Sequence, residues 1–458
     1  MSSDTTRKQE VTSLMYIALP LVAAYLAEFA MFLTTKMVVG KLGYLELAAV
    51  GISSSLSFEI LVIMMGLLSI VGVLCAQAEG AGMKDQAGLA VKQGLILSLI
   101  LGIPAAYLIW NLDWFLHLTG QDPQVIELSV PYLRAISTFV FPILFFSVMR
   151  SFVSALAKPK SVMVITVVAV AINYGLTYWF VHGGLGLPAL GLTGAGLATN
   201  IVSWLMFIAL TIHIYRVPLF RGYGVFKSHW NLDYDVCREI IVLGVPVAGL
   251  VLLEAGMFVA ASVLSGAINA ETLAAYEIVG SWIGIPFVIA MGIPEATMIR
   301  VAYGVGRDNL KDARQSGMLG MALGIGVLST LIIVPLVFPT QIIRMFISPD
   351  DQGFDLVSAL AIQFFVIAAL FQVFDGLQAI AARALRGLKD SVVPLWIAGF
   401  GYWVLGIGGG ALLAFHFNLD GEGIWWGMAL GLMTTGSMLA WRFNGLSQRR
   451  IQQHLSDA

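Results

Sequence analysis

The sequence has little charge for its length. Only 11% of its 458 residues are Asp, Glu, Lys or Arg, and 59% are hydrophobic. A soluble globular chain averages about 25% charged residues, so these polar residues are too few to cover the domains that this length would otherwise indicate. The net charge of −2 also lacks the basic face of a nucleic-acid-binding protein. The composition therefore indicates an integral membrane protein whose partner is the lipid bilayer rather than nucleic acid.

The sequence is also poor in motifs that carry catalysis. Cys75 and Cys237 are its only cysteines, which excludes a disulfide framework and zinc-finger spacing. The six histidines are scattered, no HExxH occurs, and no strand precedes a glycine-rich phosphate loop. A membrane enzyme and an ATPase are therefore both disfavoured, no cofactor is expected, and an ion gradient is the expected energy source. The polar start, Met1–Glu10, does not resemble a signal peptide.

Long apolar runs are what the sequence does contain. A membrane-spanning helix needs about 20 mostly apolar residues, and we predict twelve such helices. The runs are Leu14–Thr35, Leu47–Cys75, Leu89–Trp110, Val130–Ser154, Val162–Val181, Leu192–Ile214, Ile240–Leu264, Thr272–Ile299, Gly317–Val337, Val357–Ala382, Ser391–Phe415 and Gly423–Trp441. With both termini in the cytoplasm, 21 basic residues fall inside and 4 outside. This bias supports the number of spans and their direction.

The two halves of the chain repeat each other at an offset of 226 residues. The matched pairs are Pro20 with Pro246, Glu28 with Glu254, Gly40 with Gly266 and, after a small gap, Gly80 and Gly82 with Gly304 and Gly306. Six helices per half is an even number, so the repeats are parallel. We predict an N-terminal lobe of residues 1–214, a cytoplasmic linker of residues 215–238 and a C-terminal lobe of residues 239–458. Two such bundles place a central cavity along their interface.

Ionisable residues inside the predicted spans are the candidate functional residues, because charge in hydrocarbon is costly. Glu254 lies within predicted span 7 and Asp375 within span 10. Gln372 and Gln378 lie three residues to either side of Asp375, so we predict that they share its face and form a polar stripe suited to a cavity wall. Glu28 is the repeat partner of Glu254, and Glu277 lies at the start of span 8. Apolar contact near these acids is predicted for six residues: Phe371, Phe374, Met257, Phe258, Trp282 and Phe287.

Each acid also has a structural interpretation, because a buried carboxyl can be protonated or paired with a base. Lys36 lies two turns after Glu28 and is a possible partner, and Glu295 lies near a solvated helix end. No basic residue lies mid-helix in the second half to neutralise Glu254 and Asp375. A desolvated carboxyl favours its neutral form and a nearby cation favours its charged form. Such a group can exchange a proton or a metal ion for an organic cation, which is the requirement for antiport.

Four segments together resemble the multidrug and toxic compound extrusion (MATE) family in its NorM-like branch. They are ALRGLKDSVVP after span 10, FQVFDGLQ with Asp375, PALGLTGAGLATNIVSW in span 6 and LLEAGMF with Glu254. The resemblance implies two six-helix lobes around a central cavity and a monomer in a bacterial inner membrane. It implies export of amphipathic organic cations in exchange for Na⁺ or H⁺, with Glu254 and Asp375 holding the coupling cation, including Na⁺ if that ion is used.

The sequence departs from the family pattern in the first span. Many members carry an Asp five residues before the glycine that is Gly40 here, but this chain has Thr35 at that position and Lys36 beside it. Glu28 is a possible substitute. Two alternatives stay open at this point: a flippase or exporter of a lipid-linked or anionic metabolite, which would need cleft cations to hold phosphate, and a passive channel.

Overall fold

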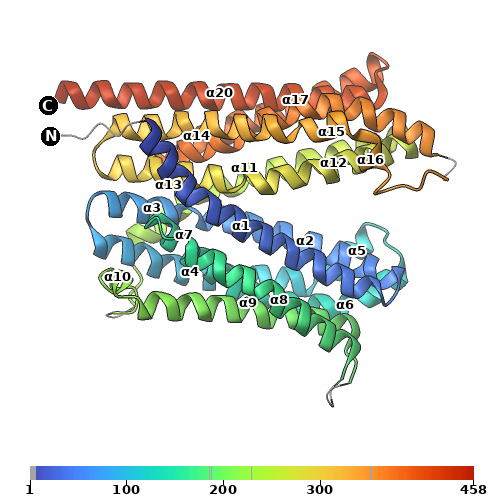
Figure 1. The fold of residues 1–458 in the computed structure, drawn as a ribbon, viewed down its shortest axis with the longest axis horizontal. Coiled ribbons are helices and arrows are strands. Elements are labelled where there is room, and N and C mark those ends of the chain that lie inside the picture. The colour runs from blue at the N-terminus through green and yellow to red at the C-terminus, as the bar shows by residue number, and fades with distance from the viewer. Residues whose placement is uncertain (1–6, 185, 187, 228–229, 351–352, 458) are drawn as a thin grey trace. The chain divides into compact units, whose positions relative to one another are not determined.

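The computed structural model describes residues 7–184, 186, 188–227, 230–350 and 353–457, and helices make up most of this part of the chain (Figure 1). The first half contains α1 (Arg7–Gly40), α2 (Tyr44–Leu68), α3 (Ile70–Gly80), α4 (Lys84–Trp110), α5 (Leu112–Leu118), α6 (Pro123–Ile136), η1 (Ser137–Phe139), α7 (Val140–Ala155), α8 (Lys160–His182), α9 (Gly191–Arg216) and α10 (Pro218–Arg221).

The second half starts with the long helix α11 (Tyr234–Ile268). It continues with α12 (Ala270–Ala290), α13 (Gly292–Gly306), α14 (Leu310–Leu331), α15 (Ile333–Val337), α16 (Pro339–Ile343), α17 (Phe354–Gly387), α18 (Val392–Gly399), the π-helix η2 (Phe400–Gly408), α19 (Gly409–Ala411), the π-helix η3 (Leu412–His416) and α20 (Asp420–Asp457).

Eleven stretches of the described chain are helical, long and apolar enough to cross a membrane. Each overlaps one of the first eleven predicted spans, and several consist of two helices in line, such as α2 with α3 and α12 with α13. The twelfth predicted span, Gly423–Trp441, lies within α20 but is not among the eleven. Its glycines, threonines and tryptophans lower its mean hydropathy, although the run is helical throughout.

The chain forms two compact units. The N-unit is Leu19–Ala248, and the C-unit is Met1–Ala18 together with Gly249–Ala458. These bounds differ from the predicted lobes, because the start of α1 belongs to the C-unit and the start of α11 belongs to the N-unit. Both boundaries fall inside a helix and within two residues of a proline, Pro20 in α1 and Pro246 in α11. Proline removes one backbone hydrogen bond from a helix interior, so each crossing helix is weakened where it changes unit.

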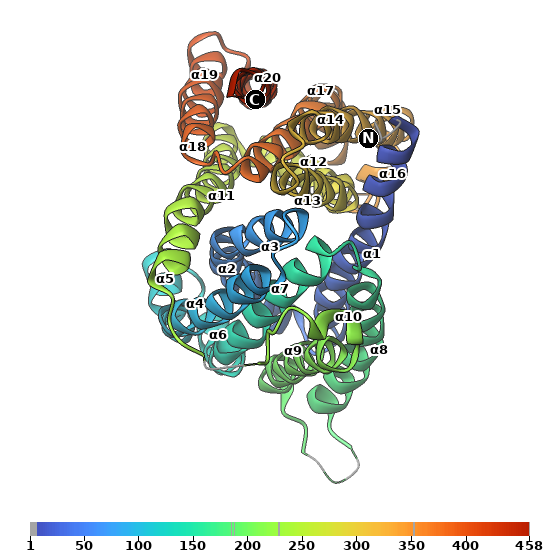
Figure 2. The ribbon, with the colours of Figure 1, turned by 90° about the vertical axis from the view of Figure 1, so that its left-hand side faces the viewer.

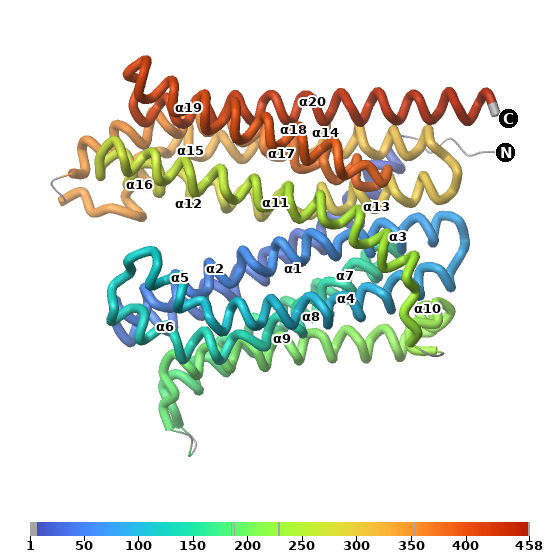
Figure 3. The backbone as a smooth tube through the Cα atoms, turned by 180° about the vertical axis from the view of Figure 1, so that it is seen from behind, coloured from blue at the N-terminus to red at the C-terminus, as the bar shows by residue number. Residues whose placement is uncertain are grey.

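Each unit is organised around one central helix. In the N-unit, α7 packs against α2, α3, α4 and α9. In the C-unit, α17 packs against α12, α13 and α14 (Figure 2) and runs alongside α20 (Figure 3). A helix that is surrounded by others carries apolar residues on all faces, and its few polar residues are therefore buried. This arrangement determines the surroundings of Asp375 on α17.

The turns between helices repeat as the helices do. Gly82 follows α3 with a φ of 74°, and Asp308 follows α13 with a φ of 58°. These left-handed residues are related by the 226-residue offset, and so are the helix ends Gly80 and Gly306. The structure therefore aligns Gly80 with Gly306 and corrects the gapped alignment with Gly304, because sequence matching weighed glycine identity and not the helix end.

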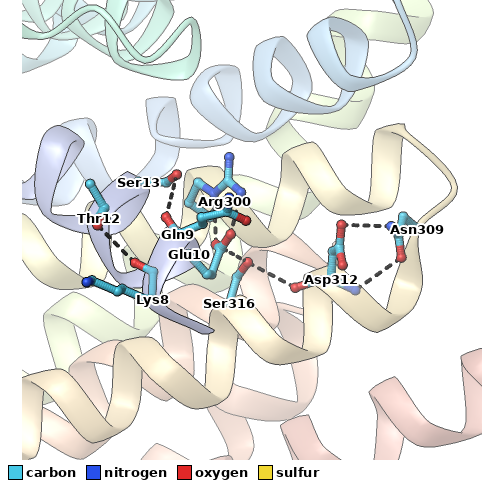
Figure 4. A network of polar contacts seen from close by, with 9 residues as sticks. All are labelled: Lys8, Gln9, Glu10, Thr12, Ser13, Arg300, Asn309, Asp312 and Ser316. Atoms are coloured by element: carbon cyan, nitrogen blue, oxygen red, sulfur yellow. Dashed lines mark hydrogen bonds and ion pairs between the residues drawn. The ribbon is translucent and has the colours of Figure 1, made fainter. Parts of the chain in front are cut away.

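The start of α1 is held in the C-unit by a buried network (Figure 4). Glu10 is 1% exposed and accepts hydrogen bonds from Arg300 Nε at 2.9 Å, from Arg300 Nη2 at 2.6 Å and from Ser316 Oγ at 2.5 Å. Arg300 lies on α13 and Ser316 on α14. Charge-assisted hydrogen bonds to a buried carboxylate are strong and directional, so this end of α1 is fixed to two helices that are remote in the sequence.

Candidate ion and substrate site

Asp375 is the most deeply buried acid on α17. Its exposed fraction is 4%, and its Oδ1 atom has no hydrogen-bond partner among the described residues. It lines a small pocket inside the C-unit with a cavity volume of about 10 Å³, close to the room that one water molecule needs. The other lining residues are Phe287, Ala290, Met291, Pro294, Leu328, Gln372, Gly376, Ala379 and Ile380. A buried acid in an otherwise apolar pocket is a common form of binding site.

Glu254 on α11 is half-buried and lies close enough to Asp375 for the two charges to interact. Both residues belong to the C-unit. Two carboxylates that share a low-dielectric region repel each other when both are ionised. The pair is therefore most stable when a proton or another cation is bound between or beside the two groups.

Tyr402 on the π-helix η2 is a third member of the site, and it was not predicted from the sequence. Its side chain is fully buried and lies within electrostatic range of Glu254 and Asp375. Gln378 lies beside the Tyr402 hydroxyl without reaching hydrogen-bond geometry. A tyrosine in an apolar run resembles a lipid-facing anchor, so the only sequence signal was the unusual density of glycine around it.

Glycines place η2 close to α20 and so position Tyr402. A Cβ on Gly431 would lie 2.5 Å from the carbonyl oxygen of Gly401, and a Cβ on Gly427 would lie 2.5 Å from the carbonyl oxygen of Gly406. Small residues allow membrane helices to approach this closely. π-Helical segments are frequent at functional sites, and here the segment turns Tyr402 toward the two acids.

The predicted polar stripe on α17 is split between two environments. Gln372 lines the pocket with Asp375, whereas Gln378 is not among the lining residues and instead lies near Gly436 of α20 and Tyr402 of η2. Residues three before and three after Asp375 are each rotated by about 60° in opposite directions on a helix of 3.6 residues per turn. The two glutamines therefore flank the acid and do not share one face.

Of the predicted apolar residues, Phe287 lines the pocket, whereas Phe371, Phe258 and Met257 are not among its lining residues. Phe371 is fully buried in an aromatic cluster, where its ring centroid is 5.9 Å from Phe258 and 5.7 Å from Trp425. Tyr276 packs on Trp425 and donates a hydrogen bond from its hydroxyl to the Phe258 carbonyl at 2.9 Å. Met257 is also fully buried, and it faces Gly406 of η2. These side chains support α11 and α17 in the C-unit.

The other two predicted acids, Glu277 and Glu28, each have a partner of their own. Glu277 is exposed and accepts a hydrogen bond from Ser262 Oγ at 2.7 Å. Glu28 forms an ion pair with Arg150, whose Nη1 atom is 2.7 Å from Glu28 Oε1. Lys36 was the partner suggested by spacing, but its amine lies over the Phe32 ring at 4.2 Å. Arg150 was missed because it lies on α7, 122 residues away, and local spacing cannot reveal such a contact.

The position of the missing first-span aspartate is occupied by a neutral pair in the N-unit. Thr35 is 6% exposed, and its hydroxyl donates to Asn173 Oδ1 on α8 at 3.2 Å. Thr34 also contacts Asn173, at 3.5 Å. The neutral hydroxyl and amide here carry no titratable charge.

Oxygen and amide groups surround the two carboxylates of the C-unit. Within the part of the chain that the structure describes, no group of three or more His, Cys, Asp and Glu residues comes together. A hard cation such as Na⁺ would therefore depend on Glu254 and Asp375 with neutral oxygens nearby, of which Gln378 and Tyr402 each offer one. Oxygen ligands are those that hard cations prefer.

The sequence profile of the MatE family matches residues 20–179 and 246–412, one segment in each half. The chain belongs to the MatE family. Its relatives include proteins named "Probable multidrug resistance protein NorM" from Mesorhizobium japonicum, 35% identical over 95% of this chain and 94% of the relative, and from Rhizobium meliloti, 32% identical over 98% and 96%. These MatE relatives are named as multidrug resistance proteins and not as enzymes.

Solved structures share the fold of this MatE chain. The eukaryotic MATE transporter AtDTX14 superposes with a TM-score of 0.86 at 22% identity, covering 98% of this chain and 99% of that one. A MOP superfamily transporter from Pyrococcus furiosus superposes with a TM-score of 0.86 at 18% identity, covering 96% of each chain. At these identities the comparison establishes the fold alone, which this chain shares with both structures.

Proposed function

We propose that this chain is a secondary active multidrug exporter that moves amphipathic organic cations out of a bacterial cell in exchange for Na⁺ or H⁺. It acts without a cofactor, as a monomer in the inner membrane, with both termini in the cytoplasm. The names of the NorM relatives support the transported class, and the excess of basic residues in alternate loops supports the orientation.

The observation that carries this proposal is the pair of like-charged acids, Glu254 and Asp375, beside unpartnered polar groups. Four buried atoms in this region have no hydrogen-bond partner among the described residues: Asp375 Oδ1, Gln372 Nε2, Gln378 Oε1 and Tyr402 Oη. Buried polar atoms in native proteins are almost always satisfied. A concentration of unsatisfied atoms around two acids therefore favours a site that binds and releases a cation.

The chemistry of exchange follows from competition for the same negative charge. A bound proton or Na⁺ relieves the repulsion between the two carboxylates, and a bound organic cation relieves it equally. Binding of one cation therefore weakens binding of the other, which is a negative coupling between two ligands. If the site opens to one side at a time, this competition converts the gradient of the small ion into export of the large one.

The test uses purified full-length protein in liposomes, with ethidium as the transported probe. A Na⁺ gradient and a pH gradient are imposed one at a time, and ethidium efflux and ion movement are recorded. The proposal expects one of the gradients to drive uphill ethidium movement. Glu254→Gln and Asp375→Asn are expected to abolish the coupled flux while the protein elutes as a folded monomer.

Asp355→Asn is the matched control, because Asp355 is an exposed acid in the first turn of the same helix, α17. It is expected to retain coupled flux. Normal exchange by both Glu254→Gln and Asp375→Asn would overturn the proposal. Binding of an anionic lipid in preference to ethidium would favour the flippase alternative instead.

A further inference from the structure

The pocket that contains Asp375 is lined by more than one turn of α17, from Gln372 to Ile380. Ala379 and Ile380, on the next helical turn, line it from one side, and Met291 and Pro294 line it from the other. The next residue on the same face, one turn beyond Ala379, is Arg383, because positions four apart on a helix lie one above the other.

Arg383 lies at this end of the pocket. Its two terminal nitrogens are 3.8 and 3.9 Å from the sulfur of Met291, which is a lining residue. Its Nε atom is 4.0 Å from Glu295 Oε2, and Glu295 follows the lining residue Pro294 on α13. Both side chains are mostly buried, with exposed fractions of 19% for Arg383 and 12% for Glu295.

A second arginine adds to the positive charge here. Arg386 is 7% exposed and lies within electrostatic range of Arg383 and Glu295. Two guanidinium groups and one carboxylate are net positive. An arginine keeps its charge even when it is poorly solvated, so a small cation that moves from Asp375 toward this end meets a repulsive field. The 4.0 Å separation of Arg383 and Glu295 is long for an ion pair, so the pair can open at low cost.

We propose that Arg383, Arg386 and Glu295 form an electrostatic gate that closes one end of the Asp375 pocket to the coupling ion. The proposal rests on the proposed function, since it assumes that Asp375 binds that ion. The positive charge of the two arginines creates an electrostatic barrier to movement of the coupling ion. The negative charge of Glu295 lowers this barrier enough for the ion to leave when the Arg383–Glu295 contact opens. All three act as positioning residues for ion movement and do not hold the transported drug. The predicted orientation places this end toward the cytoplasm.

A purely structural role makes a different prediction. If the Arg383–Glu295 contact only tied α13 to α17, removing either partner would loosen the same contact and change transport in the same direction. An electrostatic gate gives opposite signs, because Arg383→Gln removes positive charge from the barrier and Glu295→Gln removes negative charge from it. The direction of the two effects therefore separates the two roles.

The experiment measures ion leak without drug in proteoliposomes, using an internal pH-sensitive dye for H⁺ and an internal Na⁺ indicator for Na⁺. Arg383→Gln is expected to raise the leak about 10-fold, whereas Arg383→Lys, which keeps the charge, stays near the wild type. Glu295→Gln is expected to lower the leak and to slow ethidium exchange several-fold. Thermal unfolding and size-exclusion elution confirm that each variant is folded.

Two further variants locate the leak. Asp390→Asn breaks the Asp390–Arg442 pair of the same unit, whose atoms are 2.6 Å apart, and is expected to leave the leak unchanged. Adding Asp375→Asn to Arg383→Gln is expected to remove the extra leak, because the ion no longer binds in the pocket. The proposal is overturned if Arg383→Gln and Glu295→Gln shift the leak in the same direction, or if the leak persists without Asp375. Failure of the proposed function is a separate outcome, in which the wild type shows no drug-driven ion movement.

Discussion

Glu28 in the N-unit and Glu254 in the C-unit occupy the same position of the internal repeat, but their surroundings differ. Glu28 contacts Arg150 at 2.7 Å, and the Arg150 guanidinium also lies over the Tyr25 ring at 5.0 Å. Glu254 lies within electrostatic range of a second acid, Asp375. The duplicated scaffold therefore keeps the carboxylate and changes the charge of its neighbour. A basic neighbour holds the carboxylate permanently, whereas an acidic neighbour leaves the pair dependent on an exchangeable cation.

The same difference appears on the central helices. In the N-unit, α7 supplies the base Arg150, which is 7% exposed. In the C-unit, α17 supplies the acid Asp375 to the corresponding region. Removing one member of a buried pair of opposite charges leaves the other uncompensated and destabilises the fold. Removing one of two like charges relieves repulsion, so the cost should appear in ion and drug binding.

The largest expected effect is the loss of transport in the C-unit. Glu254→Gln and Asp375→Asn should each reduce ion-coupled ethidium flux by about 100-fold, since each removes a charged contact of a few kcal/mol. Thermal unfolding of both variants should match the wild type or exceed it. Flux in proteoliposomes and unfolding in detergent are the two measurements, and a large loss of stability with normal flux per folded molecule would contradict the comparison.

The next largest effect is a loss of stability in the N-unit. Glu28→Gln should lower the free energy of unfolding by about 2 kcal/mol, because Arg150 is left poorly compensated in a mostly buried position. The double variant Glu28→Gln, Arg150→Met should recover most of that loss, since neither charge remains. Equal destabilisation by the single and the double variant would show that the ion pair is not the cause.

A smaller effect is expected at Tyr402. Tyr402→Phe removes one neutral oxygen near the two acids but keeps the ring that packs in η2. Flux should fall by about 5-fold, with a higher ion concentration needed for half-maximal rate, because a neutral hydrogen-bonding group contributes about 1 kcal/mol. The test is a titration of the ethidium efflux rate against the concentration of the driving ion. Tyr276→Phe is the control, because the Tyr276 hydroxyl donates its hydrogen bond to a backbone carbonyl.

The smallest effect is expected at Glu277. This acid is exposed near the start of α12 and hydrogen-bonded to Ser262, so it does not share the buried surroundings of Asp375. Glu277→Gln should lower ethidium flux by no more than about 2-fold, as exposed charges contribute little. A loss as large as that of Asp375→Asn would place Glu277 in the cation path and extend the site beyond α11, α17 and η2.

The sequence was sufficient to predict the features that depend on local composition. Long apolar runs predicted the helices, and the repeat predicted that Glu28 and Glu254 are related. The placement of Asp375 between two glutamines predicted a polar position on an apolar helix, and in the structure Asp375 is buried and lines a pocket.

Features that depend on contacts between distant helices were not predictable. Spacing suggested Lys36 as the ion-pair partner of Glu28, but the partner in the structure is Arg150 on α7. Gln378 was assigned to the face of Asp375, but a rotation of about 60° per three residues turns it toward α20 and η2. Tyr402 carried no charge that would have distinguished it from other aromatic residues in an apolar run, and its position depends on glycine contacts that only packing reveals.

The anchoring of Glu10 has a consequence for biosynthesis. Membrane proteins are inserted from the N-terminus as they are translated, and domains generally fold in that order. The partners of Glu10 are Arg300 and Ser316. The ribosome must therefore add about 290 further residues before Glu10 can form the first of these contacts. The helix that emerges first is therefore among the last to reach its final packing, and a nascent chain stopped before α13 would carry Glu10 without the base that neutralises it.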